Sequence, residues 1–157
     1  MYSKEELRQL NILFWEKFGQ FCLVHPNLRH KPRKWMLHRT KVKDLAFRFD
    51  VNRQNAKVIL ELGSRSENLR LKAFEILERY KIVMEEGFEN GLIWDFYHER
   101  DDSKKPVCRI YTQLDGVDLH RQNQWPEIFN FFITNMSRLE DNFLLVRDVL
   151  VEELKHP

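Results

Sequence analysis

The chain has 157 residues, the usual length of one compact domain, and we expect residues 1–157 to share a single core. Hydrophobic residues make up 43% of the chain and charged residues 32%, a balance that excludes a disordered protein. The longest apolar stretches are too short for a membrane span or a signal peptide. We therefore expect a cytoplasmic protein with no membrane partner.

The N-terminal stretch has the pattern of an amphipathic helix. Ser3 and Glu6 have capping-box spacing, in which each side chain accepts a hydrogen bond from the backbone N–H of the other. The pattern stops before His25-Pro26, so it predicts a helix that begins after Ser3. Its apolar stripe, which we expect in the core, consists of Leu7, Leu10, Phe14, Phe18 and Phe21.

After residue 44 the apolar period changes to two, which is typical of half-buried strands. Residues 45–51 alternate in this way, Asn52 to Asn55 supply turn chemistry, and Lys57 to Leu62 return as a second strand. These segments predict a hairpin. Trp35 to Thr40 is a further candidate strand ahead of it.

A second helix and a second hairpin follow. Ser66 is a candidate N-cap, and Gly87 is a candidate stop. The helix between them has Leu69, Ala73, Leu77, Tyr80 and Met84 on one face. In the hairpin, Leu92, Trp94 and Phe96 alternate with Asp95 and Tyr97, a polar turn occupies residues 101–103, and Val107 to Gln113 form the return strand.

The C-terminal stretch predicts the longest helix, which begins near Trp125-Pro126. Its apolar residues alternate at four- and three-residue spacing, as Phe132, Met136, Leu139, Phe143, Val146 and Leu150. This stripe suits a helix lying on its own sheet, or a self-association seam between two subunits. The order of elements predicts an α+β two-layer sandwich, with an antiparallel sheet of about five strands covered by three helices.

The strongest indication of a partner is a run of positive charge that we call the basic segment, residues 29–43. It contains seven basic residues and no acid, and the other residues hold 19 basic against 24 acidic. Its cations could neutralise phosphates, and its rings could stack on unpaired bases. The candidate nucleic-acid-binding residues are Arg29, Lys31, Arg33, Lys34, Trp35, His38, Arg39, Lys41 and Lys43.

A second interpretation of the basic segment is a solvated loop whose charges pair with acids elsewhere in the chain. The C-terminal helix offers such acids. They are Glu140, Asp141, Asp148, Glu152 and Glu153.

Acids near the first hairpin suggest a test for a nuclease site. A restriction-endonuclease-like site needs an Asp and then Glu-x-Lys on the next strand, because two carboxylates hold Mg²⁺ and the lysine stabilises the phosphate. Asp44 and Asp50 precede Glu61, but Glu61-Leu62-Gly63 lacks the lysine, and Lys57 lies four residues before Glu61. A degenerate metal-dependent nuclease is therefore only a third hypothesis.

The sequence predicts no cofactor, metal site or catalytic residue. Cys22 and His25 are three residues apart, but no second pair at finger-like spacing accompanies them. We expect Cys22 and Cys108 to be reduced and buried. Gly-x-Ser-x-Gly elbows and Gly-rich phosphate loops are absent from the sequence.

Several short motifs resemble an uncharacterised bacterial family, domain of unknown function 4268. They are residues 14–19, residues 35–43 leading into Phe47-Arg48-Phe49-Asp50, the strand Ala56 to Glu61, and residues 114–118 followed by Trp125-Pro126. The resemblance covers nearly the whole chain. In that family the domain occurs alone, and also as the C-terminal part of proteins whose N-terminal half is similar to restriction-endonuclease-like nucleases. The resemblance thus implies a nuclease or another protein as partner, and it implies no catalytic residue.

The sequence therefore favours a non-catalytic accessory or binding domain over an enzyme. The first hypothesis is association with nucleic acid through the basic segment. The alternative is a protein-interaction or homodimerisation module with no nucleic-acid role.

Overall fold

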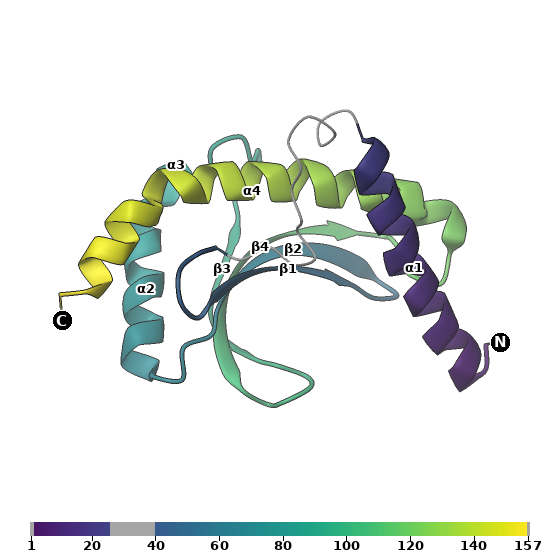
Figure 1. The fold of residues 1–157 in the computed structure, drawn as a ribbon, viewed down its shortest axis with the longest axis horizontal. Helices are drawn as coiled ribbons and strands as arrows, with labels where there is room; N and C mark the ends of the chain where they lie inside the picture. The colour runs from purple at the N-terminus through teal and green to yellow at the C-terminus, as the bar shows by residue number, and fades with distance from the viewer. Residues whose placement is uncertain (1, 26–39, 157) are drawn as a thin grey trace.

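The computed structural model describes residues 2–25 and 40–156, which form an antiparallel sheet and the helices that cover it (Figure 1). The α+β class is thereby confirmed. The elements are α1 (Lys4–Val24), β1 (Leu45–Val51), β2 (Asn55–Leu62), α2 (Glu67–Arg79), α3 (Lys81–Met84), β3 (Ile93–Glu99), β4 (Pro106–Asp115), η1 (Gln122–Gln124) and α4 (Trp125–Leu154).

The sheet consists of two hairpins joined side by side. Its strand order is β1-β2-β4-β3, and all neighbours are antiparallel. Phe47, Leu60 and Ile110 lie opposite one another across three strands, and all three are buried. Successive side chains of a strand point to opposite faces, so the next row, Arg48 and Ile59, lies on the other face.

Local chemistry explains where the first two helices begin and where the first hairpin turns. The predicted capping box is confirmed, because Ser3 Oγ accepts from Glu6 N–H at 3.1 Å and Glu6 Oε1 accepts from Ser3 N–H at 3.3 Å. Ser66 caps α2 as predicted. In the turn, Asn52 Oδ1 accepts from the N–H groups of Gln54 and Asn55. Each bond satisfies a backbone donor that would otherwise lack a partner.

The expected count of five strands is wrong, because the described residues form four. The fifth candidate, Trp35 to Thr40, lies outside the described residues except for Thr40, which is not in a strand. That stretch is dense in charge and lacks the strict alternation that located β1, so it gave a weak basis for a strand.

The second predicted helix is divided in two, which makes four α-helices in the described chain instead of three. The break is at Tyr80, whose φ of −104° and ψ of 28° leave the helical region. Its backbone separates α2 from the four-residue α3.

A bulge in β3 overturns part of the predicted alternation. The pairing with β4 shifts between Asp95 and His98, which places an additional residue in β3. Phe96, expected on the apolar face, is 65% exposed, and Tyr97 beside it is also exposed.

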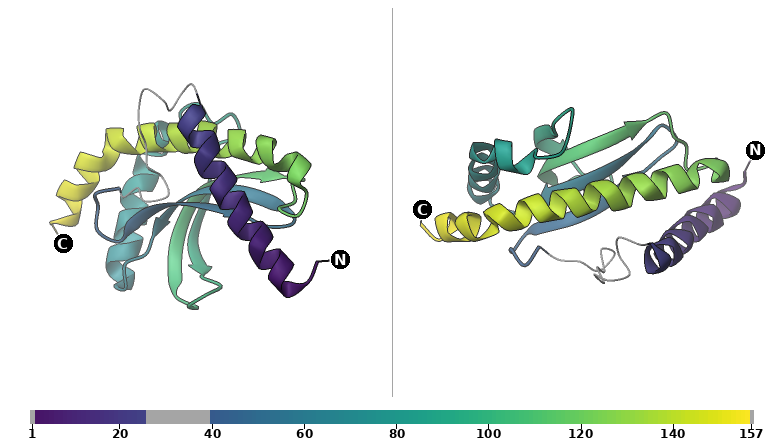
Figure 2. Two further views of the ribbon diagram at one scale, coloured as in Figure 1. Left: turned by 45° about the vertical axis from the view of Figure 1, so that its right-hand side comes forward. Right: turned by 90° about the horizontal axis from the view of Figure 1, so that it is seen from above.

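The core lies between α4 and one face of the sheet. Figure 1 shows the sheet arching beneath α4, with α1 at one end of the helix and α2 at the other, and Figure 2 shows α4 crossing the strands from above. Phe14 and Phe18 of α1 make ring contacts with Phe129 and Phe132 of α4. The six stripe residues of α4 are all buried in this core.

The opposite face of the sheet, which we call the open face, is covered by none of the helices in the described chain (Figure 1). It is polar where the other face is apolar. Its residues include Arg48, Asp50, Lys57, Ile59, Glu61, Arg109 and Tyr111. None of the helices described is long and apolar enough to cross a membrane.

Two leucines of α4 provide a matched test of this packing. Leu139 is fully buried in the core, whereas Leu145 is 73% exposed on the same helix. We expect Leu139→Ala to lower the free energy of unfolding by about 2–5 kcal/mol, because it leaves a cavity. At protein concentrations where the chain is monomeric, Leu145→Ala should change it by less than about 0.5 kcal/mol. Urea unfolding followed by circular dichroism measures both, and equal losses would contradict the packing of α4.

Candidate functional site

The predicted nucleic-acid-binding residues fall mostly outside the part of the chain that the structure describes. Lys41 and Lys43 are described, and both are exposed. Neither forms an ion pair with another described residue. The other seven predicted residues lie outside the part of the chain that the structure describes. They are Arg29, Lys31, Arg33, Lys34, Trp35, His38 and Arg39.

The end of the basic segment is anchored to the sheet by backbone contacts. Thr40 is buried, and its hydroxyl lies 2.9 Å from the Leu45 carbonyl and accepts from Val42 N–H at 3.0 Å. Lys41 has φ of 64° and Asp44 has φ of 67°, left-handed values that are uncommon outside glycine. Gly63 N–H donates to the Asp44 carbonyl at 2.7 Å. The two exposed lysines therefore project from a fixed turn.

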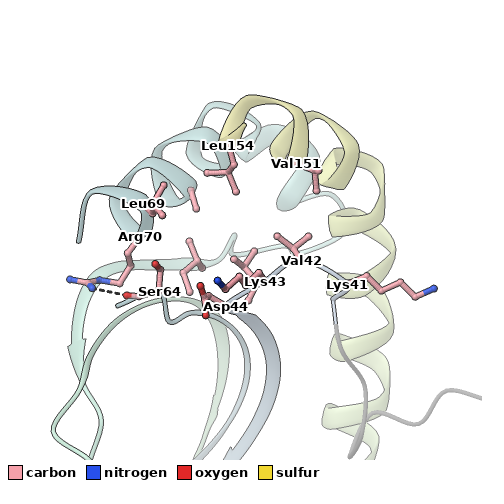
Figure 3. Close-up of a pocket in the computed structure, with 12 residues that line it drawn as sticks. Lys41, Val42, Lys43, Asp44, Ser64, Leu69, Arg70, Val151 and Leu154 are labelled. Atoms are coloured by element: carbon pink, nitrogen blue, oxygen red, sulfur yellow. Dashed lines mark hydrogen bonds between the residues drawn. The ribbon is translucent and has the colours of Figure 1, made fainter. Parts of the chain in front are cut away.

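An apolar cavity of about 280 Å³ lies behind this turn (Figure 3). Leu69 of α2 and Val151 and Leu154 of α4 face Val42 across it, while Lys41 points away. At one side, the buried Arg70 donates through Nη1 to the Ser64 carbonyl at 3.0 Å. Most of the lining residues are aliphatic, and the charged residues Lys41, Lys43, Asp44 and Arg70 lie among them, so the cavity suits an apolar group with a polar end.

The stripe predicted for self-association is not a free surface. Phe132, Met136, Leu139, Phe143, Val146 and Leu150 are buried within one chain. A second copy of the chain has no access to them in this fold, so a dimer would need another part of the surface.

The acids considered for a nuclease site do not converge. Asp50 pairs with Lys57 at 3.9 Å, while Glu61 is held by Arg48 at 2.7 Å. Asp50 lies opposite Lys57, four residues from Glu61, which is about 13 Å along β2. Asp44 is in the turn before β1. Among residues 2–25 and 40–156, no group of three His, Cys, Asp or Glu side chains could hold a metal ion.

Instead, the open face contains a charged hollow of about 380 Å³ at its centre, beneath the tip of the β3–β4 hairpin. Four cations and four carboxylates line it, and most are paired. They are Arg48, Lys57, Arg100 and Arg109, with Asp50, Glu61, Asp101 and Asp102. Besides the two pairs above, Arg100 bonds Asp102 at 3.1 Å and lies 4.0 Å from Glu61. We call this the open-face hollow.

Among the charged groups of the hollow, Arg109 has buried nitrogens without a hydrogen-bond partner in the described chain. It was not among the residues predicted from the sequence. It is only 8% exposed, and its Nη1 donates to His98 Nε2 at 2.7 Å. Its guanidinium also lies over the Tyr111 ring, 5.0 Å from the centroid. The sequence feature that could have identified Arg109 is its position between Cys108 and Ile110, in a strand that is otherwise apolar at that point.

The two cysteines have the properties of structural thiols. Both are free; Cys108 is buried as predicted, whereas Cys22 is only partly buried. Burial raises the pKa of each thiol, that of Cys22 to about 11. Cys108 Sγ lies 3.0 Å from the Phe96 carbonyl, to which it donates. A raised pKa keeps the thiol protonated, and the protonated form is a poor nucleophile.

The fold and the site together define a small α+β domain with a helix-covered antiparallel sheet and a charged open face. The family model described as Domain of unknown function (DUF4268) matches residues 10–145, and the chain belongs to this family. The resemblance noted in the sequence is thus confirmed. Comparison with curated proteins and with solved structures gave no match.

The pKa of Cys22 leads to a labelling prediction. With a pKa of about 11, only about 0.1% of the thiol is ionised at pH 8, and that fraction rises roughly tenfold per pH unit up to the pKa. We expect iodoacetamide to label Cys22 far more slowly in the native protein than in denaturant at pH 8, as followed by mass spectrometry. The difference should shrink as the pH approaches 11. Equal rates at pH 8 would contradict the raised pKa of this partly buried thiol.

Proposed function

We propose that this chain is a non-catalytic accessory domain that binds nucleic acid through the basic segment, residues 29–43. The proposal rests on one observation, the seven basic residues without an acid in a chain whose other residues are net acidic. Such a cluster attracts phosphates and releases their counterions, whereas dispersed charges of both signs do not.

The acids of α4 give further support, because most of them have other partners. Glu153 bonds Arg79 at 2.7 Å, Glu152 pairs with Lys155 and His156, and Asp148 lies 4.0 Å from Arg147. Three of the five acids that could have neutralised the basic segment are thus in contact with cations outside it. These contacts weigh against neutralisation of the segment by Asp148, Glu152 and Glu153.

The anchored turn at one end of the segment also favours binding. The turn that carries Lys41 and Lys43 is held by the Thr40 hydroxyl and by Gly63. Because the backbone of this turn is already ordered, only the two lysine side chains lose conformational freedom when a phosphate is bound.

The direct test is fluorescence anisotropy of labelled single- and double-stranded DNA and RNA at about 50 and about 200 mM salt. If most of the segment contacts phosphates, affinity should fall roughly a thousandfold over this range. The triple variant Lys31→Glu, Arg33→Glu, Lys34→Glu should abolish binding, because it replaces three cations by three anions, and should leave the melting temperature unchanged.

A matched control separates local charge from net charge. Lys4, Lys17 and Lys81 are exposed on α1 and α3, away from the basic segment in sequence. Replacing these three by Glu changes the net charge by the same amount and should leave most of the binding intact. Retained affinity in the basic-segment variant, or no binding by the native protein at low salt, would refute the proposed function.

A second candidate function is self-association through the outward side of α4. Leu144, Leu145 and Val149 are 43%, 73% and 38% exposed there. Leu145 and Val149 are four residues apart and share one side of the helix. Two copies could bury these residues antiparallel to each other in a closed dimer, which is the commonest oligomeric form.

Light scattering at high concentration tests this candidate. We expect a dimer that persists at high salt, because the contact is apolar. Leu145→Glu should convert this dimer to a monomer without loss of the helical circular dichroism signal. A native protein that is monomeric at about 0.5 mM would remove the candidate, since that concentration is high for a specific interface.

A further inference from the structure

We propose that the open-face hollow is a binding site for one phosphate group, which Arg109 would hold by two parallel hydrogen bonds. This site is separate from the basic segment. It does not require that the proposed nucleic-acid role be correct.

The first argument is the hydrogen-bonding state of the Arg109 guanidinium. Its Nη1 is used by His98 Nε2, and a guanidinium has donors only, so Nε2 is the acceptor and the imidazole proton is on Nδ1. Nε and Nη2 are buried and have no hydrogen-bond partner in the described chain. Leaving one such donor unsatisfied is costly, and here two neighbouring donors are unsatisfied.

The second argument is the geometry of these two nitrogens. Nε and Nη2 form one edge of the planar guanidinium, and their N–H groups point in nearly the same direction. This is the edge that binds two oxygens of a carboxylate or phosphate at once. Because Tyr111 lies against the face of the guanidinium and His98 takes Nη1, the plane is already oriented before any ligand binds.

The third argument is that the carboxylates nearby are already occupied. Glu61, opposite Arg109 on β2, is bonded to Arg48, while Asp50 and Asp102 pair with Lys57 and Arg100. Asp95, opposite Arg109 on β3, accepts instead from Tyr97 N–H at 3.1 Å. Asp101 is exposed at the hairpin tip. The cation of the hollow that forms no ion pair with another described residue is therefore Arg109, the most buried of the four.

These flanking acids also define the ligand. Glu61 and Asp95 lower the electrostatic potential at Arg109, so a ligand of high negative charge would be repelled. A phosphodiester or a singly ionised phosphate brings one charge and two acceptor oxygens, which matches the free edge of Arg109.

The buried state of the two nitrogens implies that a side chain turns aside when the ligand enters. The Arg48–Glu61 pair is placed for this movement, because Arg48 is nearly half exposed and Glu61 lies directly across from Arg109. Neutralising Glu61 should therefore ease entry and strengthen binding.

The test is NMR titration with inorganic phosphate, in which the Nε–H resonance of Arg109 reports directly on the site. We expect a saturable shift with a dissociation constant on the order of 1 mM. Arg109→Gln should abolish phosphate binding measured by calorimetry, and Glu61→Gln should strengthen it several-fold. The control variant is Arg79→Gln. The Arg79 side chain is exposed on α2 and paired with Glu153, so this variant should bind phosphate as the native protein does.

Oligonucleotide competition then identifies the source of the phosphate. If the source is a nucleic-acid backbone, an oligonucleotide shifts the Arg109 resonance and displaces phosphate. If it is a small phosphorylated molecule, phosphate shifts the resonance and the oligonucleotide does not. The basic-segment variant, which should lose oligonucleotide binding, should keep its phosphate site, so failure of the proposed function and failure of this site give different results.

Two outcomes would overturn the site. One is an Arg109 Nε–H resonance that does not respond to phosphate, and the other is a shift that grows linearly without saturation, as weak ionic screening would produce. If Arg109→Gln does not fold, titration of the native protein and of Glu61→Gln still tests the site. Unchanged or weakened phosphate binding in Glu61→Gln would also contradict it.

Discussion

One face of α4 is buried along nearly the whole helix, against the sheet in the middle and against the other helices toward its ends, and the other elements take their positions from this contact. At one end of α4, Phe129 and Phe132 pack against Phe14 and Phe18 of α1. Farther along, Asn142 Nδ2 donates at 2.9 Å to the carbonyls of Met84 and Glu86, which fixes the end of α3 to the helix. Hydrophobic burial supplies the stabilisation, and this buried amide adds direction because its partners must be placed correctly.

Because the described helices all lie on one face, the opposite face of the sheet faces solvent and carries charge. On β2, Leu60 points into the core while Ile59 and Glu61 point outward, so a single strand serves both environments. The outward charges form pairs that span neighbouring strands, such as Arg48 with Glu61. Such a face is well defined geometrically without a covering layer where charges pair across strands, as Arg48 and Asp50 of β1 do with Glu61 and Lys57 of β2.

Much of this fold could be predicted from the sequence, and the failures have physical causes. The capping box at Ser3, the alternation of residues 45–51 and the stripe of α4 each depend on neighbours along the chain, and each was located correctly. The bulge after Asp95 depends on pairing with β4, which overrides local periodicity. The apolar spacing from Leu69 to Met84 continues through Tyr80, so it gives no sign of the break there. Arg109 was missed for a related reason, because its unsatisfied edge follows from contacts with His98 and Tyr111 on two different strands.

The strand order has a consequence for the folding kinetics of the chain. Each hairpin pairs segments that are close in sequence, so both can form early and independently. The pairing of β2 with β4 must close the loop from Leu62 to Cys108, which contains α2, α3 and β3. Loop closure is entropically unfavourable until the contacts that it permits are made. Among the strand pairings of this sheet, β2 with β4 therefore carries the largest loop-closure cost.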